Sequence, residues 1–311
     1  MNTNKDKYKA FCATRDDIPI FSEPWWLDAV CADGSWDVCL IEKKGELLGY
    51  LPFYLAKVKG FKVIRMPKLT PYLGVQIIYP AGLSPKKKMD LEQKLTSLLI
   101  EQLPQTSYTQ IIHHPDFQNW LPFHWAGFRQ TTMYTYRLNI KNTDLVFSNF
   151  RKNLKRNIAK AQEQLKCVET KDIQSFYDLI LATFSRQDMD TPFTFEFFKK
   201  LDHQLSLQNR RIIFSTYDHS GKMVAAGYYV WDNHTAYYLL GGHLGHREAM
   251  SWTMWHAIQH FSNKVQVLDF EGSMLKSIAH FFSGFGAQPI PYHHTYKGKN
   301  KLVDVLKILK S

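Results

Sequence analysis

The chain has 311 residues, 45% of them hydrophobic and 14% aromatic, and its formal net charge is +11. This composition excludes an intrinsically disordered protein, and no window approaches the roughly 18 uninterrupted apolar residues of a membrane-spanning helix. The positive charge favours an anionic partner, such as a nucleotide-bearing cofactor, nucleic acid or an acidic lipid surface, but it fits excess lysine that only aids solubility equally well.

The first 17 residues are polar and contain no apolar segment like that of a signal peptide, so we expect a cytoplasmic protein. The four cysteines have neither CxxC nor Cys/His spacing, which indicates no disulfide framework and no zinc site. We therefore expect no metal cofactor. The cysteines are Cys12, Cys31, Cys39 and Cys167.

The first half predicts a strand meander followed by alternating helices and strands. After a short helix at residues 25–30, apolar residues alternate through residues 36–67, with turn signals at Lys44-Gly45 and Lys59-Gly60. This pattern is typical of about three antiparallel strands. The elements predicted next are a helix at 90–103, a strand at 108–113, a helix at 119–126 and a strand at 131–140.

The second half repeats this order in a longer form. A basic helix at residues 145–165 and two amphipathic helices precede a second three-strand meander, and then a helix, a strand, a shorter helix and a final strand follow. The repetition indicates a duplicated α+β architecture with a boundary near residues 141–144. We predict an N-terminal module at 1–143 and a C-terminal module at 144–311. The later predicted elements are helices 173–186 and 195–207, strands 211–217, 223–231 and 235–240, helix 247–261, strand 265–270, helix 277–285 and strand 290–296.

A glycine-rich segment joins the last meander strand to the next helix. Glycines allow backbone N–H groups to approach a ligand, and a helix N-terminus attracts phosphate, so a pyrophosphate is expected to bind here. A tight strand-to-helix turn explains the same glycines about equally well. The candidate cofactor-binding residues are Gly241, Gly242, His243, Gly245 and Arg247.

The apolar strand at residues 265–270 ends in carboxylates and a hydroxyl. Strand ends hold catalytic groups rigidly, and Glu271 is our candidate for a general base that deprotonates an amine or hydroxyl acceptor. Ser273 and Tyr292 are its candidate hydrogen-bonding partners. Capping of the following helix is the stronger interpretation for Ser273 and the weaker one for Glu271.

The basic helix presents cations beside an apolar face. Arg151, Lys155 and Arg156 are candidates for binding the phosphates of a cofactor or of RNA. A solvated charged face is the more usual explanation of such a helix.

Two segments of the second half carry a family resemblance. Residues 156–161 (RNIAKA) resemble a helix of Fem-type proteins, and residues 269–273 (DFEGS) with 281–286 (FFSGFG) resemble their downstream strand and Phe-Gly turn. The resemblance covers roughly residues 145–298, whereas the first half is similar in element order only. The chain thus resembles the GNAT superfamily, in its Fem-type and CelD-type branch of tandem modules.

The resemblance implies a fold and an activity. It implies two tandem GNAT modules, each a mixed, mostly antiparallel sheet flanked by helices, in which the fourth and fifth strands splay to admit a thioester donor. It also implies acyl-CoA as donor substrate, with the pyrophosphate at the glycine segment. By analogy, the N-terminal module is non-catalytic and only borders the cleft.

The sequence departs from the family pattern at two places. The usual (Arg/Gln)-x-x-Gly-x-(Gly/Ala) loop of acetyl-CoA users is not reproduced. Fem-type enzymes that use aminoacyl-tRNA typically carry lysine beside the phenylalanine of the Phe-Gly turn, where this chain has Phe282. That lysine stabilises developing oxyanion charge.

The leading hypothesis is therefore an acyltransferase that moves an acyl group from acyl-CoA to an amine or hydroxyl, on a small molecule or a cell-envelope precursor. The second is Fem-type transfer from aminoacyl-tRNA to a cell-wall precursor. The third is a non-catalytic GNAT-like module that only binds a ligand.

Overall fold

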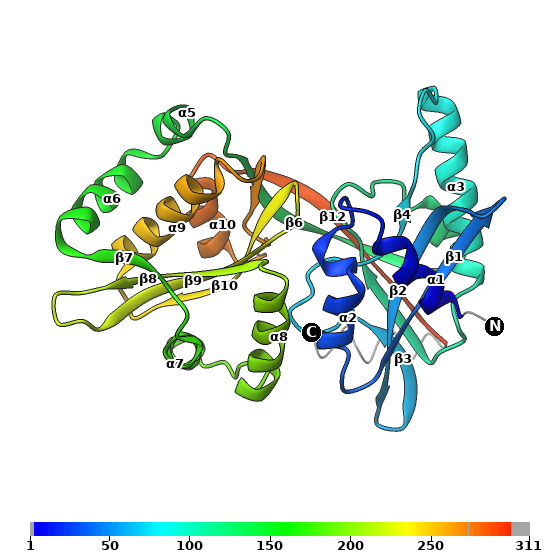
Figure 1. Ribbon diagram of the computed structural model, residues 1–311, viewed down its shortest axis with the longest axis horizontal. Helices are drawn as coiled ribbons and strands as arrows, with labels where there is room; N and C mark the ends of the chain where they lie inside the picture. Colours follow the sequence, from blue (N-terminus) through cyan, green and yellow to red (C-terminus); the bar gives the residue numbers. More distant parts are fainter. Residues whose placement is uncertain (1–2, 273, 300–311) are drawn as a thin grey trace. The chain divides into compact units, whose positions relative to one another are not determined.

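The computed structural model describes residues 3–272 and 274–299, and it divides into two compact units (Figure 1). The second unit is the continuous segment Tyr134–Ile290, whereas the first combines the chain up to Met133 with the residues from Pro291 onward. The predicted α+β class is confirmed in both units, since each has a sheet flanked by helices.

The first unit is built on the predicted meander. Its sheet has the order β1-β2-β3-β5-β12, with β4 also paired to β2. Neighbouring strands are antiparallel except β3 and β5, which run parallel. The strands are β1 (Ser35–Lys43), β2 (Glu46–Val58), β3 (Phe61–Arg65), β4 (Gln76–Ile77), β5 (Tyr108–Ile112) and β12 (Gln288–Gly298).

Helices complete the core of the first unit. Leu51 and Ile64 of the sheet cluster with Leu99 of α3 and Phe123 of α4, and all four are buried. The apolar spacing that predicted the helix at 90–103 is the face that packs here. The helices are α1 (Asn4–Cys12), the 3-10 turn η1 (Ile20–Ser22), α2 (Pro24–Val30), α3 (Pro85–Glu101) and α4 (Leu121–Trp125).

The second unit has the sheet order β6-β11-β10-β9-β8-β7. β10 and β11 are parallel, and the other pairs are antiparallel. The strands are β6 (Arg129–Asn139), β7 (Lys166–Thr170), β8 (Arg211–Tyr217), β9 (Met223–Trp231), β10 (Thr235–His243) and β11 (Val267–Asp269).

Helices cover both faces of this sheet. α6 and α9 lie on one face, and α7 and α8 on the other (Figure 1). The first face holds a core that joins Leu138 and Leu268 of the strands, and Phe270 just after β11, to helix residues. The latter are Ile258 of α9 and Phe282 of α10. The helices are α5 (Thr143–Ser148), α6 (Lys152–Gln164), α7 (Ile173–Ser185), α8 (Phe195–Leu207), α9 (Arg247–Phe261) and α10 (Lys276–Ser283).

The terminal strand of each half pairs outside its own half. β6 closes the first half in sequence but pairs with β11 of the second unit, and β12 closes the second half but pairs with β5 of the first. For this reason the compact units differ from the continuous stretches 1–143 and 144–311 expected from the sequence.

The basic helix expected at residues 145–165 is two helices. Asn149 ends α5, and the extended residue Arg151 (φ −59°, ψ 146°) precedes α6. The Arg151 N–H donates to the carbonyl of Gly284, which is a tertiary contact that sequence periodicity does not report.

Candidate functional site

A row of polar residues crosses three strands of the second unit. The β10–β11 register places Tyr237 opposite Asp269, and the β11–β6 register places Asp269 opposite Arg137. Register partners share a face of the sheet, and side chains alternate along each strand. Because Leu138 and Leu268 face the core beneath α9, this polar row lies on the opposite face.

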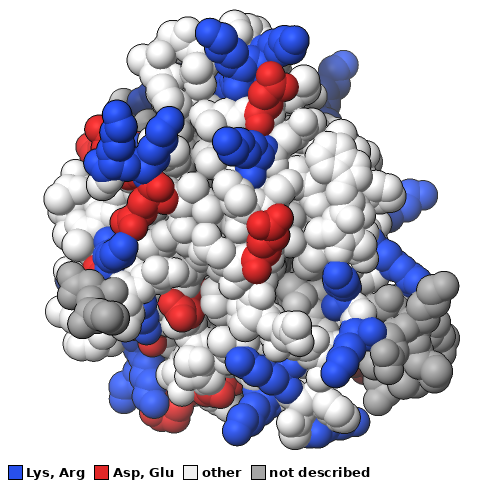
Figure 2. Space-filling model, turned by 90° about the vertical axis from the view of Figure 1, so that its right-hand side faces the viewer, with Lys and Arg blue, Asp and Glu red and all other residues white. Residues whose placement is uncertain are grey.

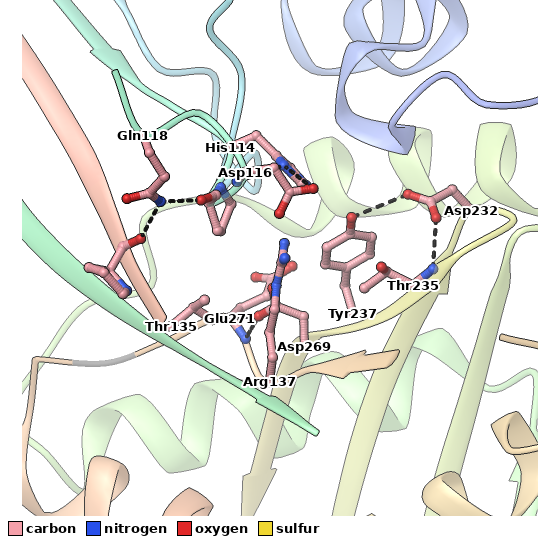
Figure 3. A network of polar contacts seen from close by, with 12 residues as sticks. His114, Asp116, Gln118, Thr135, Arg137, Asp232, Thr235, Tyr237, Asp269 and Glu271 are labelled. Carbon is pink, nitrogen blue, oxygen red and sulfur yellow. Dashed lines mark hydrogen bonds and ion pairs between the residues drawn. The ribbon is translucent and has the colours of Figure 1, made fainter. Parts of the chain in front are cut away.

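Asp269 is the centre of the row. Its side chain is fully buried, and Oδ2 accepts from Nε of Arg137 at 2.8 Å. Oδ1 accepts from the Thr135 hydroxyl and from the backbone N–H of Glu271, the latter at 2.9 Å. Figure 3 shows these three residues gathered around Asp269. The arginine and the two further donors compensate the burial of the Asp269 carboxyl group and hold it in place.

The chain leaves β11 through two consecutive left-handed residues. Glu271 has φ 55° and Gly272 has φ 46°. A Cβ at position 272 would lie 2.2 Å from the carbonyl oxygen of Tyr134, so only glycine fits against β6 here. A non-glycine residue in the left-handed region costs roughly 1–2 kcal/mol, and such strain clusters at functional sites. The turn therefore fixes where the Glu271 side chain begins.

The Glu271 carboxyl group is desolvated. The residue is partly exposed as a whole, but its Oε1 is buried and has no hydrogen-bond partner among residues 3–272 and 274–299. Burial, and secondarily the negative charge of Asp269, raises the pKa of Glu271 well above its usual value. A desolvated carboxyl group holds its proton more tightly than an exposed one, so once ionised it is a stronger base.

Tyr237 lies opposite Asp269 on the β10 side. Its hydroxyl donates to Oδ2 of Asp232 at 3.2 Å, while Oδ1 of Asp232 accepts from the backbone N–H of Thr235 at 2.8 Å (Figure 3). Burial raises the pKa of Tyr237 well above its ordinary value, so the phenol stays protonated and donates.

The described members of the predicted catalytic trio belong to different parts of the chain's structure. Glu271 belongs to the second unit, whereas Tyr292 lies on the β12 segment of the first unit, buried with its ring edge-on to Tyr72 at 5.2 Å. Ser273 lies outside the described residues. The partners that the structure gives to the Glu271 turn are instead Asp269 and the backbone of β6.

Gly241 and Gly242 lie within a strand and not in a loop. They pair with Gly227 and Ala226 of β9. A Cβ at Gly241 would overlap the ring of Tyr238, and one at Gly242 would lie 2.3 Å from Oγ1 of Thr183 on α7. Close packing within the strand, and not a tight strand-to-helix turn, thus accounts for both glycines.

The turn before α9 still has the features of an anion site. His243 ends β10, and its Nδ1 accepts from the N–H of Gly245 at 3.1 Å, where φ is 94°. No side chain that the structure describes caps α9, whose preceding residue is His246. The first N–H groups of the helix can therefore donate to a phosphate. Arg247 begins α9, and its side chain lies outside the described residues.

β10 and β11 separate next to Glu271. Their pairing covers only Thr235–Tyr237 against Val267–Asp269, and residues 238–243 of β10 continue beyond it. β10 also has a bulge between Tyr238 and Leu240. The separation places one edge of β10, the Glu271 turn and the N-terminus of α9 around the same end of the two strands.

The three candidate anion-binding cations have different surroundings. Arg151 donates to the His280 carbonyl at 3.0 Å and to the Ser283 hydroxyl at 2.6 Å, which fixes the C-terminal end of α10. Lys155 donates to the carbonyl of Ser148 at 2.8 Å. Arg156 is exposed on α6. Of the three, Arg156 is the most accessible to an anion.

Thr135, Arg137 and Tyr237 are not among the residues predicted from the sequence. A signal was present, because Thr135, Arg137 and Asn139 alternate with Tyr136, Leu138 and Ile140, which gives the strand one polar face. Which carboxylate this face meets depends on its register with β11, and the sequence pattern does not specify that register.

No helix of the described residues is both long and apolar enough to cross a membrane. The same residues contain no group of three or more His, Cys, Asp or Glu side chains that could hold a metal ion.

Comparison with known proteins identifies one domain. Residues 148–277 match the acetyltransferase (GNAT) domain model. A comparison with curated protein sequences gives no match.

Solved structures similar to this one extend over nearly the whole chain. FemX is similar with a TM-score of 0.68 and 12% identity, covering 98% of both chains. A tandem GNAT protein from the clavulanic acid biosynthesis pathway has a TM-score of 0.56 and 10% identity, covering 96% of this chain and 95% of the other. L-PGS from Bacillus licheniformis has a TM-score of 0.55 and 11% identity, covering 99% and 97%. The predicted tandem GNAT fold is thereby confirmed.

Proposed function

We propose that this chain, which carries a GNAT domain within a tandem GNAT fold, is an acyltransferase that moves an acyl group from acyl-CoA to an amine or hydroxyl acceptor. The observation that carries the proposal is the buried, unpartnered Oε1 of Glu271 beside the separating ends of β10 and β11. A GNAT fold supports acyl transfer as a class, and this carboxyl group supplies the proton acceptor that transfer needs.

In the proposed reaction the acceptor nitrogen or oxygen attacks the thioester carbonyl carbon. Glu271, as carboxylate, takes the proton from the attacking atom, and the carbon–sulfur bond breaks as the thiolate leaves. Backbone N–H groups on the edge of β10 past Tyr237 are suited to stabilise the developing oxyanion, because β11 does not pair with that stretch. Asp269 and Gly272 act as positioning residues for Glu271.

The donor is proposed to bind with its phosphates at the N-terminus of α9. The uncapped first turn of that helix and the left-handed Gly245 support this placement. The non-catalytic role of the first unit is also a proposal, and so is an acceptor among small molecules or cell-envelope precursors.

Calorimetric titration with acetyl-CoA and longer acyl-CoAs tests the donor. We expect saturable binding that Arg247→Ala weakens and that the control Lys44→Ala, at an exposed turn of the first unit, leaves unchanged. Transfer to a panel of amines and alcohols, followed by release of free thiol, then tests the reaction. Absence of binding to every thioester would contradict the proposed donor.

A second candidate is Fem-type transfer from aminoacyl-tRNA, which the similarity to FemX favours. Transfer RNA would have to be bound through phosphate contacts, with Arg156 and its neighbours on α6 as candidates. This function predicts tRNA binding that weakens steeply as salt rises, because counterions are released at each phosphate contact. A ligand-binding module without catalysis, the third candidate, predicts tight thioester binding without thiol release.

A further inference from the structure

The hairpin between β2 and β3 projects from the first unit with an unusual composition at its tip. Lys59 (φ 50°) and Gly60 (φ 84°) form a two-residue turn in which both residues are left-handed. Glycine adopts this geometry readily, whereas lysine there costs roughly 1–2 kcal/mol. The turn places a lysine where Asn or Asp would be the favoured residue.

The strand pair next to the turn also places lysines at unfavourable positions. Lys57 and Lys62 are direct cross-strand partners, and both are exposed. Like charges directly opposite each other destabilise a strand pair. Together with Lys59, three ammonium groups therefore occupy six residues that contain no carboxylate. The stability of the hairpin alone does not account for these three lysines.

The other face of the tip is apolar. Val58 and Phe61 are cross-strand partners, and they are 37% and 62% exposed. A large aromatic side chain exposed at a hairpin tip, among lysines whose stems reach past it, forms an amphipathic wedge.

Neighbouring strand ends extend the positive charge. The N–H of Ser107, just before β5, donates to the carbonyl of Lys62 at 2.9 Å, and the N–H of Lys299, just after β12, donates to Ser107 at 3.0 Å. Lys299 is exposed. Figure 2 draws several Lys and Arg side chains in the lower part of the face that it shows, and others near its top and left edge. The basic tip thus comprises Lys57, Lys59, Lys62 and Lys299 around Val58 and Phe61.

We propose that this basic tip binds the surface of an anionic lipid bilayer. Lysines near such a surface are attracted to its phosphates, and Val58 and Phe61 enter the interface between headgroups and acyl chains. An apolar pair at the leading end distinguishes this surface from one made for phosphate alone. The few contacts predict weak and reversible binding.

Co-sedimentation of the full chain with vesicles tests the inference. The vesicles contain either phosphatidylcholine alone or equal parts of phosphatidylglycerol and phosphatidylcholine. We expect binding to the anionic vesicles only, weaker at higher salt. The triple variant Lys57→Gln/Lys59→Gln/Lys62→Gln should bind about 100-fold more weakly, since each lysine contributes about fivefold.

A matched control separates the tip from net charge. Lys86, Lys87 and Lys88 are exposed at the start of α3, so changing all three to Gln removes the same charge elsewhere. This control should bind within about twofold of the wild type, whereas Phe61→Ser, which keeps every lysine, should lose about tenfold. Circular dichroism of each variant confirms that it is folded.

Three results would overturn the inference. Equal losses in the two triple variants would make the binding a general charge effect, and no binding of the wild type to anionic vesicles would exclude a lipid surface. Binding of a single-stranded RNA through the tip in place of vesicles would assign it to nucleic acid.

Discussion

Two buried acidic side chains in the second unit have opposite surroundings. Asp202 of α8 is paired with Arg211 at 3.0 Å and accepts from the Tyr228 hydroxyl at 2.9 Å. Burial raises the pKa of Asp202, although Arg211 and Tyr228 oppose the shift. Glu271 is also desolvated, but the charge that acts on its pKa is a second carboxylate, that of Asp269, which raises it further.

This difference in hydrogen-bond partners indicates a structural role for Asp202 and a reactive one for Glu271. The partners of Asp202 use its oxygen lone pairs to join α8 to β8 and β9, which leaves no place for a substrate proton. Glu271 keeps Oε1 without a partner among the described residues, so a substrate can provide one. Burial alone does not identify a catalytic acid, but burial without compensation does point to one.

The largest expected effect is that of Glu271→Gln. Turnover should fall by about 100- to 1,000-fold, because the amide cannot accept the proton, while the fold is retained. The exposed control Glu163→Gln on α6 should leave turnover unchanged. Thiol-release kinetics on both variants measure this, and an unimpaired Glu271→Gln protein would remove the residue from the mechanism.

The turn that positions Glu271 should tolerate no side chain at residue 272. Gly272→Ala places Cβ against the Tyr134 carbonyl and should lower the free energy of unfolding by ~4 kcal/mol. Gly45→Ala, at φ 83° with no atom within 4 Å of its Cβ, isolates the conformational part, about 1–2 kcal/mol. Denaturant melts compare the two, and equal losses would show that the close approach is unimportant.

Removing the charge of Asp202 should lower the free energy of unfolding and leave turnover unchanged. Asp202→Asn leaves Arg211 buried without its counter-charge and should lower the free energy of unfolding by ~3 kcal/mol. Turnover per folded molecule should stay within about twofold of the wild-type value, because Glu271 and not Asp202 is the proposed proton acceptor. Denaturant melts and thiol-release assays on one preparation check both statements, and a large loss of turnover in folded protein would contradict them.

The smallest effect is a pH dependence of stability. The folded-state pKa of Glu271 lies above its usual value of 4.5, so the folded protein retains a proton that the unfolded chain loses. As pH rises above 4.5, the wild type should therefore lose stability relative to Glu271→Gln, until the folded-state pKa is passed. Melting temperatures of both proteins across this range provide the test, and parallel curves would contradict it.

Signals within a few residues of each other predicted the turns and correctly placed the candidate base after a strand. The meander turns at Lys44-Gly45 and Lys59-Gly60 have positive φ at all four residues. Glu271 was singled out because it follows an apolar strand. Contacts between distant segments were not predictable: the break before α6 depends on Gly284, and the Arg137–Asp269 pair depends on a register between segments about 130 residues apart.

The pairing of β6 and β12 with strands of the other half also depends on contacts between distant segments. Periodicity placed a strand at residues 131–140 and another at 290–296, and both exist as β6 and β12. Nothing in their alternation specifies which sheet they join, because any β-strand with one apolar face satisfies the same pattern.

The central claim is that the desolvated Glu271 carboxyl group has a raised pKa and acts as the proton acceptor once ionised. Infrared difference spectra between the wild type and Glu271→Gln, recorded from pH 4.5 upward, test this claim most directly. We predict a carboxylic acid band that is present only in the wild type, persists above pH 4.5 and disappears at higher pH. A Glu271 band that changes to carboxylate already at about pH 4.5 would contradict the account.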